Sequence, residues 1–104
     1  MRILLIGASG HVGSAAAAAL RPRHELIEAG RTSTPAVDIT NEASITTLLD
    51  ATGTVDAIIV AAGSVPFRPL EQLTREDYLA AFTGKVLSQL DVVRLGLPHL
   101  SDGG

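Results

Sequence analysis

The 104-residue sequence contains no cysteine and no tryptophan, and only 3% of its residues are aromatic. The lack of cysteine excludes disulfides and thiolate metal sites and is compatible with a reducing compartment, so we expect a cytoplasmic protein. Since 46% of the residues are hydrophobic, the core must be built from aliphatic side chains, as in a parallel sheet covered by helices. At this length we expect one domain, covering residues 1–104.

A strong excess of charge is also absent. The net charge is −3 and the eight Lys and Arg residues are scattered, which argues against a nucleic-acid surface. No apolar run reaches the roughly 18 residues of a membrane span, and Gly7 and Ser9 interrupt the only apolar run that a signal peptide could use. The three histidines are dispersed without carboxylates at ligand spacing, so we expect no metal site.

The most informative segment is a glycine-rich turn near the start of the chain. An apolar run at 3–6 leads into Gly7, Gly10 and Gly13, and five alanines follow Ser14. This pattern predicts a strand, a tight turn and a helix whose N-terminal amides bind a diphosphate, although the turn is one residue longer than the usual G-x-G-x-x-G. The alternative is a turn that only joins strand to helix. The predicted binding residues here are Gly7, Ser9, Gly10, His11, Val12 and Gly13.

Strand and helix signals alternate along the chain. Pro22 ends the first helix, Thr40 or Asn41 caps the second, and Thr74 with Asp77 forms a capping-box pattern for the third. These signals predict an α/β, Rossmann-like parallel sheet of about four strands with helices on both faces. We expect strands at 2–6, 25–29, 36–39 and 57–62, and helices at 11–20, 41–52 and 75–97.

The long helix at 75–97 is amphipathic. Its apolar residues recur at spacings of three and four: Tyr78, Phe82, Val86, Leu90, Val93 and Leu97. This spacing suits core packing, and Tyr78 is interpreted as a core residue. A copy of the chain could also pair along this helix, which makes a homo-oligomer through 75–97 a second hypothesis.

In a dinucleotide-binding fold, the residue that follows the second strand selects the cofactor. Arg31 lies there, 18 residues after Gly13, and its guanidinium suits the 2′-phosphate of NADP, with Thr32 adding a hydroxyl. We therefore favour NADP over NAD. Two alternatives remain open: Arg31 is a solvated loop charge, or Glu28 competes as a ribose ligand.

Asp38 and Ile39 lie at the end of the expected strand at 36–39. The Asp38 carboxylate is placed to accept a hydrogen bond from the adenine amino group, while the Ile39 N–H reaches a ring nitrogen. Alternatively, Asp38 only begins the turn before the next helix.

Together, Gly7-Ala8-Ser9-Gly10-His11-Val12-Gly13, Gly30-Arg31-Thr32, Asp38-Ile39 and Val60-Ala61-Ala62-Gly63 resemble the N-terminal half of a short-chain dehydrogenase/reductase over essentially all 104 residues. The resemblance implies the strand order 36–39, 25–29, 2–6, 57–62, with Ala61, Ala62 and Gly63 beside the bound cofactor. It also implies hydride transfer between NADP(H) and a carbonyl or alcohol substrate in the full-length protein.

The sequence departs from the family pattern in three respects. Val60-Ala61-Ala62-Gly63 replaces the family's Asn-Asn-Ala-Gly, and Lys85 takes the position of a catalytic asparagine, as a substrate or cofactor contact or as an ordinary surface lysine. The catalytic serine and Tyr-x-x-x-Lys pair have no counterpart, since Tyr78 is followed by Phe82. We therefore predict no catalytic residue and a chain truncated before the catalytic half. The alternative is a non-enzymatic NADP-binding regulatory or scaffold module.

Overall fold

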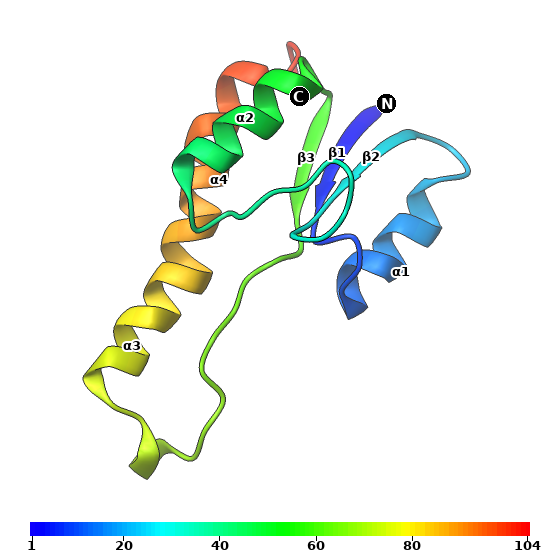
Figure 1. Ribbon diagram of the computed structural model, residues 1–104. Coiled ribbons are helices and arrows are strands. Elements are labelled where there is room, and N and C mark those ends of the chain that lie inside the picture. The colour runs from blue at the N-terminus through cyan, green and yellow to red at the C-terminus, as the bar shows by residue number, and fades with distance from the viewer.

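The computed structural model describes residues 1–104 and contains one parallel sheet. Its strands are β1 (Arg2–Ile6), β2 (Glu25–Ala29) and β3 (Ala57–Val60), in the order β2-β1-β3. Leu4 of β1 pairs with Ile27 of β2 and Ile58 of β3, so β1 is the central strand and four of its five residues are buried. All three strands point their carboxyl ends to the same edge (Figure 1).

The fourth strand expected at 36–39 is wrong, because only a single bridge forms there. Ala36 pairs with Gly30, and the Val37 N–H donates to the Gly30 carbonyl at 2.9 Å. Beyond that point the Asp38 N–H donates to the Ser44 hydroxyl at 2.9 Å. Local side-chain bonds thus compete with pairing to β2 and end the strand after one bridge. The segment still lies beside β2, where the expected strand order places it.

Helices cover both faces of the sheet, as predicted. Helix α1 (His11–Leu20) packs on one face, while α2 (Glu42–Thr52) and α4 (Ser88–Gly96) pack on the other (Figure 1). The α1 face is closed by small residues, among them the fully buried Ala17. The larger, aliphatic core lies on the opposite face and comprises Leu4, Ile6, Ala29, Val37, Ile39, Ile45, Leu48, Leu49, Val55 and Val92.

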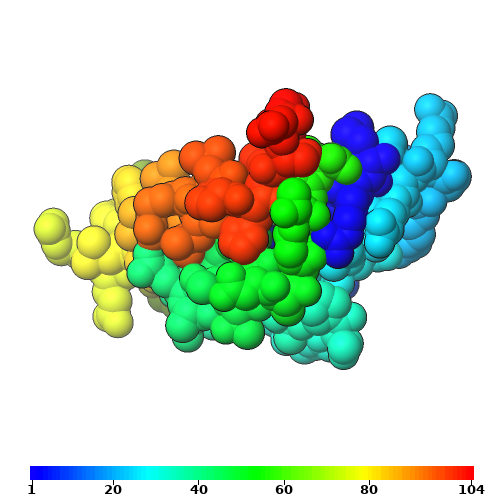
Figure 2. All heavy atoms as spheres, turned by 90° about the horizontal axis from the view of Figure 1, so that it is seen from above, coloured from blue at the N-terminus to red at the C-terminus, as the bar shows by residue number.

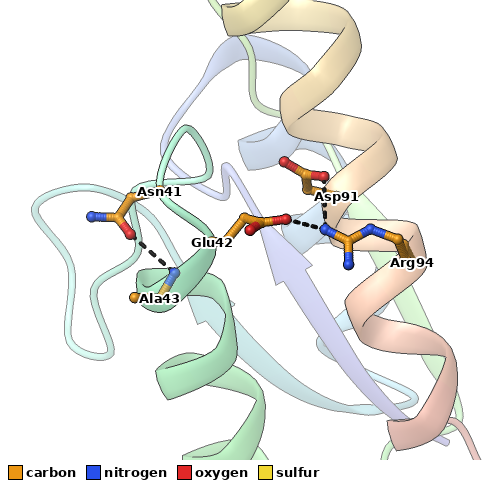
Figure 3. Close-up of polar contacts among 5 residues, drawn as sticks. All are labelled: Asn41, Glu42, Ala43, Asp91 and Arg94. Atoms are coloured by element: carbon orange, nitrogen blue, oxygen red, sulfur yellow. Dashed lines mark hydrogen bonds and ion pairs between the residues drawn. The ribbon is translucent and has the colours of Figure 1, made fainter.

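Capping residues define the ends of α2, and an exposed ion pair links this helix to α4. The Asn41 carboxamide oxygen accepts hydrogen bonds from the N–H groups of Ala43 and Ser44, at 3.0 and 3.3 Å, so Asn41 is the N-cap. At the far end, Gly53 follows the helix with a φ of +73°, which glycine adopts without steric cost. Figure 3 shows Glu42, at the start of α2, paired with Arg94 of α4, which also contacts Asp91.

The predicted long helix is continuous but irregular. Helix α3 (Arg75–Ala81) begins with the predicted capping box, Thr74 and Asp77, and passes through a π-helical segment (Phe82–Leu87) into α4 and a 3-10 turn (Leu97–His99). Helix α3 projects beyond the rest of the molecule in Figures 1 and 2, and the longest extent is 46 Å.

The face of this helix that points into the core is not the one that the apolar spacing predicted. Tyr78 is 47% exposed, so its interpretation as a core residue is wrong. The inward face is instead lined by Gly84, Ser88, Val92 and Gly96. The homo-oligomer stays a prediction, and its proposed contact surface is the outward row, hereafter the apolar row: Tyr78, Phe82, Val86, Leu90, Val93 and Leu97.

Strand β3 lies at one edge of the sheet, with β1 as its only partner strand. Its four residues, Ala57–Val60, are all apolar and all half-buried. None of the helices has the length and apolar character needed to span a bilayer.

Candidate cofactor-binding site

A cavity of about 570 Å³ opens at the carboxyl edge of the sheet. It extends from the loop after β2, across the turn after β1, to the segment after β3. Most of the predicted site residues meet here. The cavity is lined by Ile6, Gly7, Ser9, Gly10, Gly30, Arg31, Thr32, Val37, Asp38, Ile39, Thr40, Ala61, Ala62, Gly63, Ser64 and Gly84.

The three glycines of the turn differ in what a side chain would meet. Gly7 has a φ of +91°, and a Cβ there would lie 2.6 Å from the Ala61 carbonyl oxygen. A Cβ on Gly13 would lie only 1.8 Å from the Gly7 oxygen, so this glycine lets α1 start against the turn. Gly10 is different, because its Cβ would meet nothing closer than 3.6 Å. The space beside Gly10 therefore belongs to the cavity, and a bound group can approach the backbone there.

The start of α1 leaves backbone donors unpaired. Gly10 caps the helix with no side-chain hydrogen bond, and Ser14 is the first residue whose N–H donates back, to the Gly10 oxygen at 2.8 Å. The N–H groups of His11, Val12 and Gly13 precede the first helical bond and have no protein acceptor. These three residues adjoin the cavity without lining it. Unpaired amides and the positive end of the helix dipole suit an anion.

The Arg31 end of the cavity is shaped by its own loop. The Ser33 hydroxyl lies 2.8 Å from the Pro35 carbonyl oxygen and 3.2 Å from the Gly30 oxygen, and so holds the loop in place. Arg31 and Thr32 are exposed, line the cavity and make no hydrogen bond or ion pair through their side chains. An unpaired guanidinium therefore stands at this end.

Glu28 does not reach the cavity. The Arg21 guanidinium donates two hydrogen bonds to its carboxylate, at 3.0 and 2.5 Å, and these bonds lower the pKa of Glu28. Arg21 and Glu28 thus form an ion pair with each other. This pairing removes Glu28 as the competitor for a ribose that the sequence left open.

Asp38 is fixed by its neighbour Thr40. One carboxylate oxygen accepts from both the Thr40 N–H and the Thr40 hydroxyl, at 3.0 and 2.6 Å, and these bonds lower the pKa of Asp38, with a smaller contribution from the Arg31 charge. The other carboxylate oxygen has no protein partner. Asp38 thus begins the turn before α2, as one hypothesis held, and still offers an acceptor to the cavity.

The opposite end of the cavity lies where β3 meets the π-helical segment. Here Gln89 donates to the Ala62 carbonyl at 2.9 Å, and the Ser64 N–H donates to the Gly84 carbonyl at 3.1 Å. A Cβ on Gly84 would lie 2.5 Å from the Ser64 oxygen, so only glycine permits this contact. Ser64 and Gly84 were missed in the sequence, because no local pattern shows that a helix residue touches the end of β3.

The described residues contain no group of metal-ligating side chains, and Tyr78 is exposed on the outer face of α3. Among the residues that line the cavity, neither serine hydroxyl is hydrogen-bonded to a histidine or a carboxylate. One lining hydroxyl does donate to a carboxylate, that of Thr40 to Asp38, and this bond belongs to the turn before α2. The geometry therefore supports binding of a phosphate-bearing ligand.

The sequence was compared with known proteins. Residues 3–96 match the model of the NAD dependent epimerase/dehydratase family. A search of curated proteins finds no match. Among solved structures, the protein lin1944 from Listeria innocua is 46% identical, with a TM-score of 0.96, over all of this chain and 52% of that one.

Two further structures share the fold at lower identity. A small-chain dehydrogenase in complex with NADPH has a TM-score of 0.88 at 23% identity, over the whole of this chain and 48% of its own. A Serratia marcescens short-chain dehydrogenase/reductase, solved as a double mutant, has a TM-score of 0.81 at 18% identity, over 99% of this chain and 53% of its own.

The chain thus spans about half the length of the solved structures that it matches. The fold is that of the short-chain dehydrogenases/reductases, as the resemblance implied. Since the family model covers residues 3–96 of 104, this chain belongs to the NAD dependent epimerase/dehydratase family.

Proposed function

We propose that this chain is the NADP(H)-binding portion of a short-chain oxidoreductase. In the full-length protein, hydride would pass between the nicotinamide and the carbonyl or alcohol of a small-molecule substrate. The observation that carries the proposal is the cavity itself, which joins the open space beside Gly10 to the unpaired guanidinium of Arg31.

Each part of the cavity has a matching part of the dinucleotide. The free amides of His11, Val12 and Gly13 and the dipole of α1 would bind the diphosphate. Arg31 would bind the 2′-phosphate, with Thr32 beside it. The free oxygen of Asp38 would accept from the adenine amino group, and the Ile39 N–H would meet a ring nitrogen. The bound cofactor would supply or accept the hydride, while these residues bind and orient it.

The choice of NADP over NAD rests on charge. Arg31 forms no ion pair, and Glu28 is held by Arg21, so the loop after β2 presents a cation and no free carboxylate for ribose hydroxyls. A guanidinium binds phosphate through two parallel N–H donors, which a plain ribose does not use.

The test is calorimetric titration of the chain with NADPH and NADH, repeated on Arg31→Ala. We expect NADPH to bind more tightly, and Arg31→Ala to weaken NADPH by about ten- to a hundredfold while leaving NADH within about twofold. Arg23→Ala is the matched control, because it removes an exposed arginine that makes no ion pair and does not line the cavity. Equal affinities that the Arg31 substitution leaves unchanged would refute the assignment.

A second candidate is an NADP-binding regulatory module without hydride transfer. This module would use the same cavity, and the exposed apolar row of the long helix offers it a surface for a partner. The loss of NADPH absorbance with a panel of aldehydes and ketones, measured on the full-length protein, separates the two. Turnover supports the oxidoreductase, whereas tight binding without turnover supports the module.

A further inference from the structure

Lys85 is the only lysine of the chain, and it lies where the cavity ends beside β3. It belongs to the π-helical segment Phe82–Leu87 and follows Gly84, which lines the cavity. Its side chain crosses Gly63: a Cβ on Gly63 would lie 2.7 Å from the Lys85 Cδ and 3.2 Å from its Nζ. The ammonium group therefore reaches the border of the cavity at the end opposite Arg31.

Hydrogen bonds near Lys85 fix the position of the helix backbone that carries it. The Gly84 carbonyl accepts hydrogen bonds from the Ser64 N–H and from the buried Ser88 hydroxyl, at 3.1 and 2.9 Å. One turn on, Gln89 binds the Ala62 carbonyl. The helix is thus tied to the segment after β3 on both sides of Lys85. Segments of π-helix occur frequently at functional sites, because they change the direction of side chains within a helix.

The charge of Lys85 has no counterpart in the chain. Four arginines form ion pairs, Arg2, Arg21, Arg68 and Arg94, but Lys85 has neither an ion pair nor a side-chain hydrogen bond. Arg31 is likewise unpaired, so both ends of the cavity carry a free cation, and Asp38 is its only acidic lining residue. A phosphorylated dinucleotide such as NADP is a long polyanion. It has a phosphate at one end and a ribose with hydroxyls at the other, so it matches a cavity with a cation at each end.

We propose that Lys85 is a cofactor-binding residue that contacts the nicotinamide riboside half of the dinucleotide or the phosphate attached to it. This inference rests on the proposed function and adds a second anchor to the same site. Arg31 would select the adenosine half, and Lys85 would hold the other half through an ammonium that donates to ribose or phosphate oxygens. A Cβ on Gly63 would push the lysine side chain aside, and the φ of +155° at Gly63 is one that glycine adopts more readily than other residues.

The test compares two ligands that share the adenosine half. Adenosine 2′,5′-bisphosphate lacks the nicotinamide riboside and its phosphate, while NADPH carries both. We expect Lys85→Met to weaken NADPH about fivefold and to leave the bisphosphate unchanged, since a charged hydrogen bond at an exposed site is worth about that factor. Arg75→Met is the control, because it removes an exposed cation of α3 that does not line the cavity.

A direct readout is also available. After reductive methylation with isotope-labelled formaldehyde, which keeps the positive charge, the chain gives one dimethyl-lysine signal besides that of the N-terminus. We expect NADPH to shift this lysine signal and the bisphosphate to leave it in place.

Three results would overturn the inference. Lys85→Met and wild type could bind NADPH equally well, the substitution could weaken both ligands by the same factor, or both ligands could shift the lysine signal alike. If NADPH binds the wild-type chain and Lys85→Met does not change its affinity, the proposed function stands without this contact. If NADPH fails to bind the wild-type chain at all, both proposals fall.

Discussion

The Arg21 guanidinium holds the Glu28 carboxylate, on β2, through two hydrogen bonds of 3.0 and 2.5 Å. Because the carboxylate is bound there, Glu28 is not a ribose ligand. We predict that Glu28→Gln leaves the dissociation constants of NADH and NADPH within about twofold of wild type. The substitution should also change the stability of the fold little, because the ion pair is exposed. Calorimetric titration checks this, and a clear loss of NADH affinity would show that Glu28 leaves Arg21 to bind ribose.

Substitutions of two glycines of the turn should have different effects, one on cofactor binding and the other on stability. A methyl on Gly10 meets nothing within 3.6 Å, so Gly10→Ala should keep its melting temperature and yet lose about tenfold or more in NADPH affinity, because the methyl occupies ligand space. A methyl on Gly13 would overlap the Gly7 oxygen at 1.8 Å, so Gly13→Ala should cost about 3 kcal/mol of unfolding free energy. Thermal melts and titrations of both variants check the pair. A Gly10→Ala variant that binds NADPH normally would contradict the role of the turn.

Acid should destabilise the fold through carboxylates that are hydrogen-bonded in the folded state. Asp56 accepts from the Arg2 N–H and the Ser101 hydroxyl, both at 2.8 Å, and these bonds lower its pKa below the ordinary 3.8. The stabilisation is therefore complete well above pH 3.8 and is lost as the pH falls through the lower, folded-state pKa, because the unfolded chain takes up the proton first.

The measurement is the urea midpoint from neutral pH to about pH 3, for wild type and Asp56→Asn. We expect a steeper acid loss for wild type. Identical pH profiles would show that Asp56 does not contribute. Asp77, whose pKa is lowered by the Thr74 N–H at the start of α3, adds a parallel contribution that both proteins share.

The apolar row on the outer face of the long helix predicts self-association. Leu90 and Val93 are 58% and 57% exposed, and a two-fold axis would place the row of one copy on that of another. We expect light scattering to report a dimer for wild type and a monomer for Leu90→Glu. Leu70→Glu, at an exposed leucine outside the row, should leave the dimer intact. A monomeric wild-type chain would exclude this role for the row.

Much of this fold could be predicted from local sequence signals. The glycine turn, the Asn41 cap, the Thr74 capping box and the three main strands all depend on neighbouring residues, and the structure confirms each within a few residues. The strand expected at 36–39 does not form, because pairing with β2 competes with the hydrogen bond from the Asp38 N–H to Ser44, six residues away. Such competition leaves no periodic signal.

Contacts between distant segments were not predictable either. The segment after β3 contacts Gly84, within the π-helical segment, and Gln89 just beyond it, and no spacing in the sequence indicates that irregularity. The inward face of the helix was misassigned for a related reason. Glycine and serine allow the helix to approach the strand, so small residues, rather than the larger apolar ones, point at the sheet.

Strand β3 has β1 as its only partner strand, and its residues are apolar, while Val55 just before it forms a single bridge with Leu100. Concentrated solutions of this chain should therefore tend towards intermolecular sheet growth, visible as a shift of the amide I infrared band. We expect a synthetic extended peptide to pair with this free edge of β3, to cover it and so to keep the chain from aggregating.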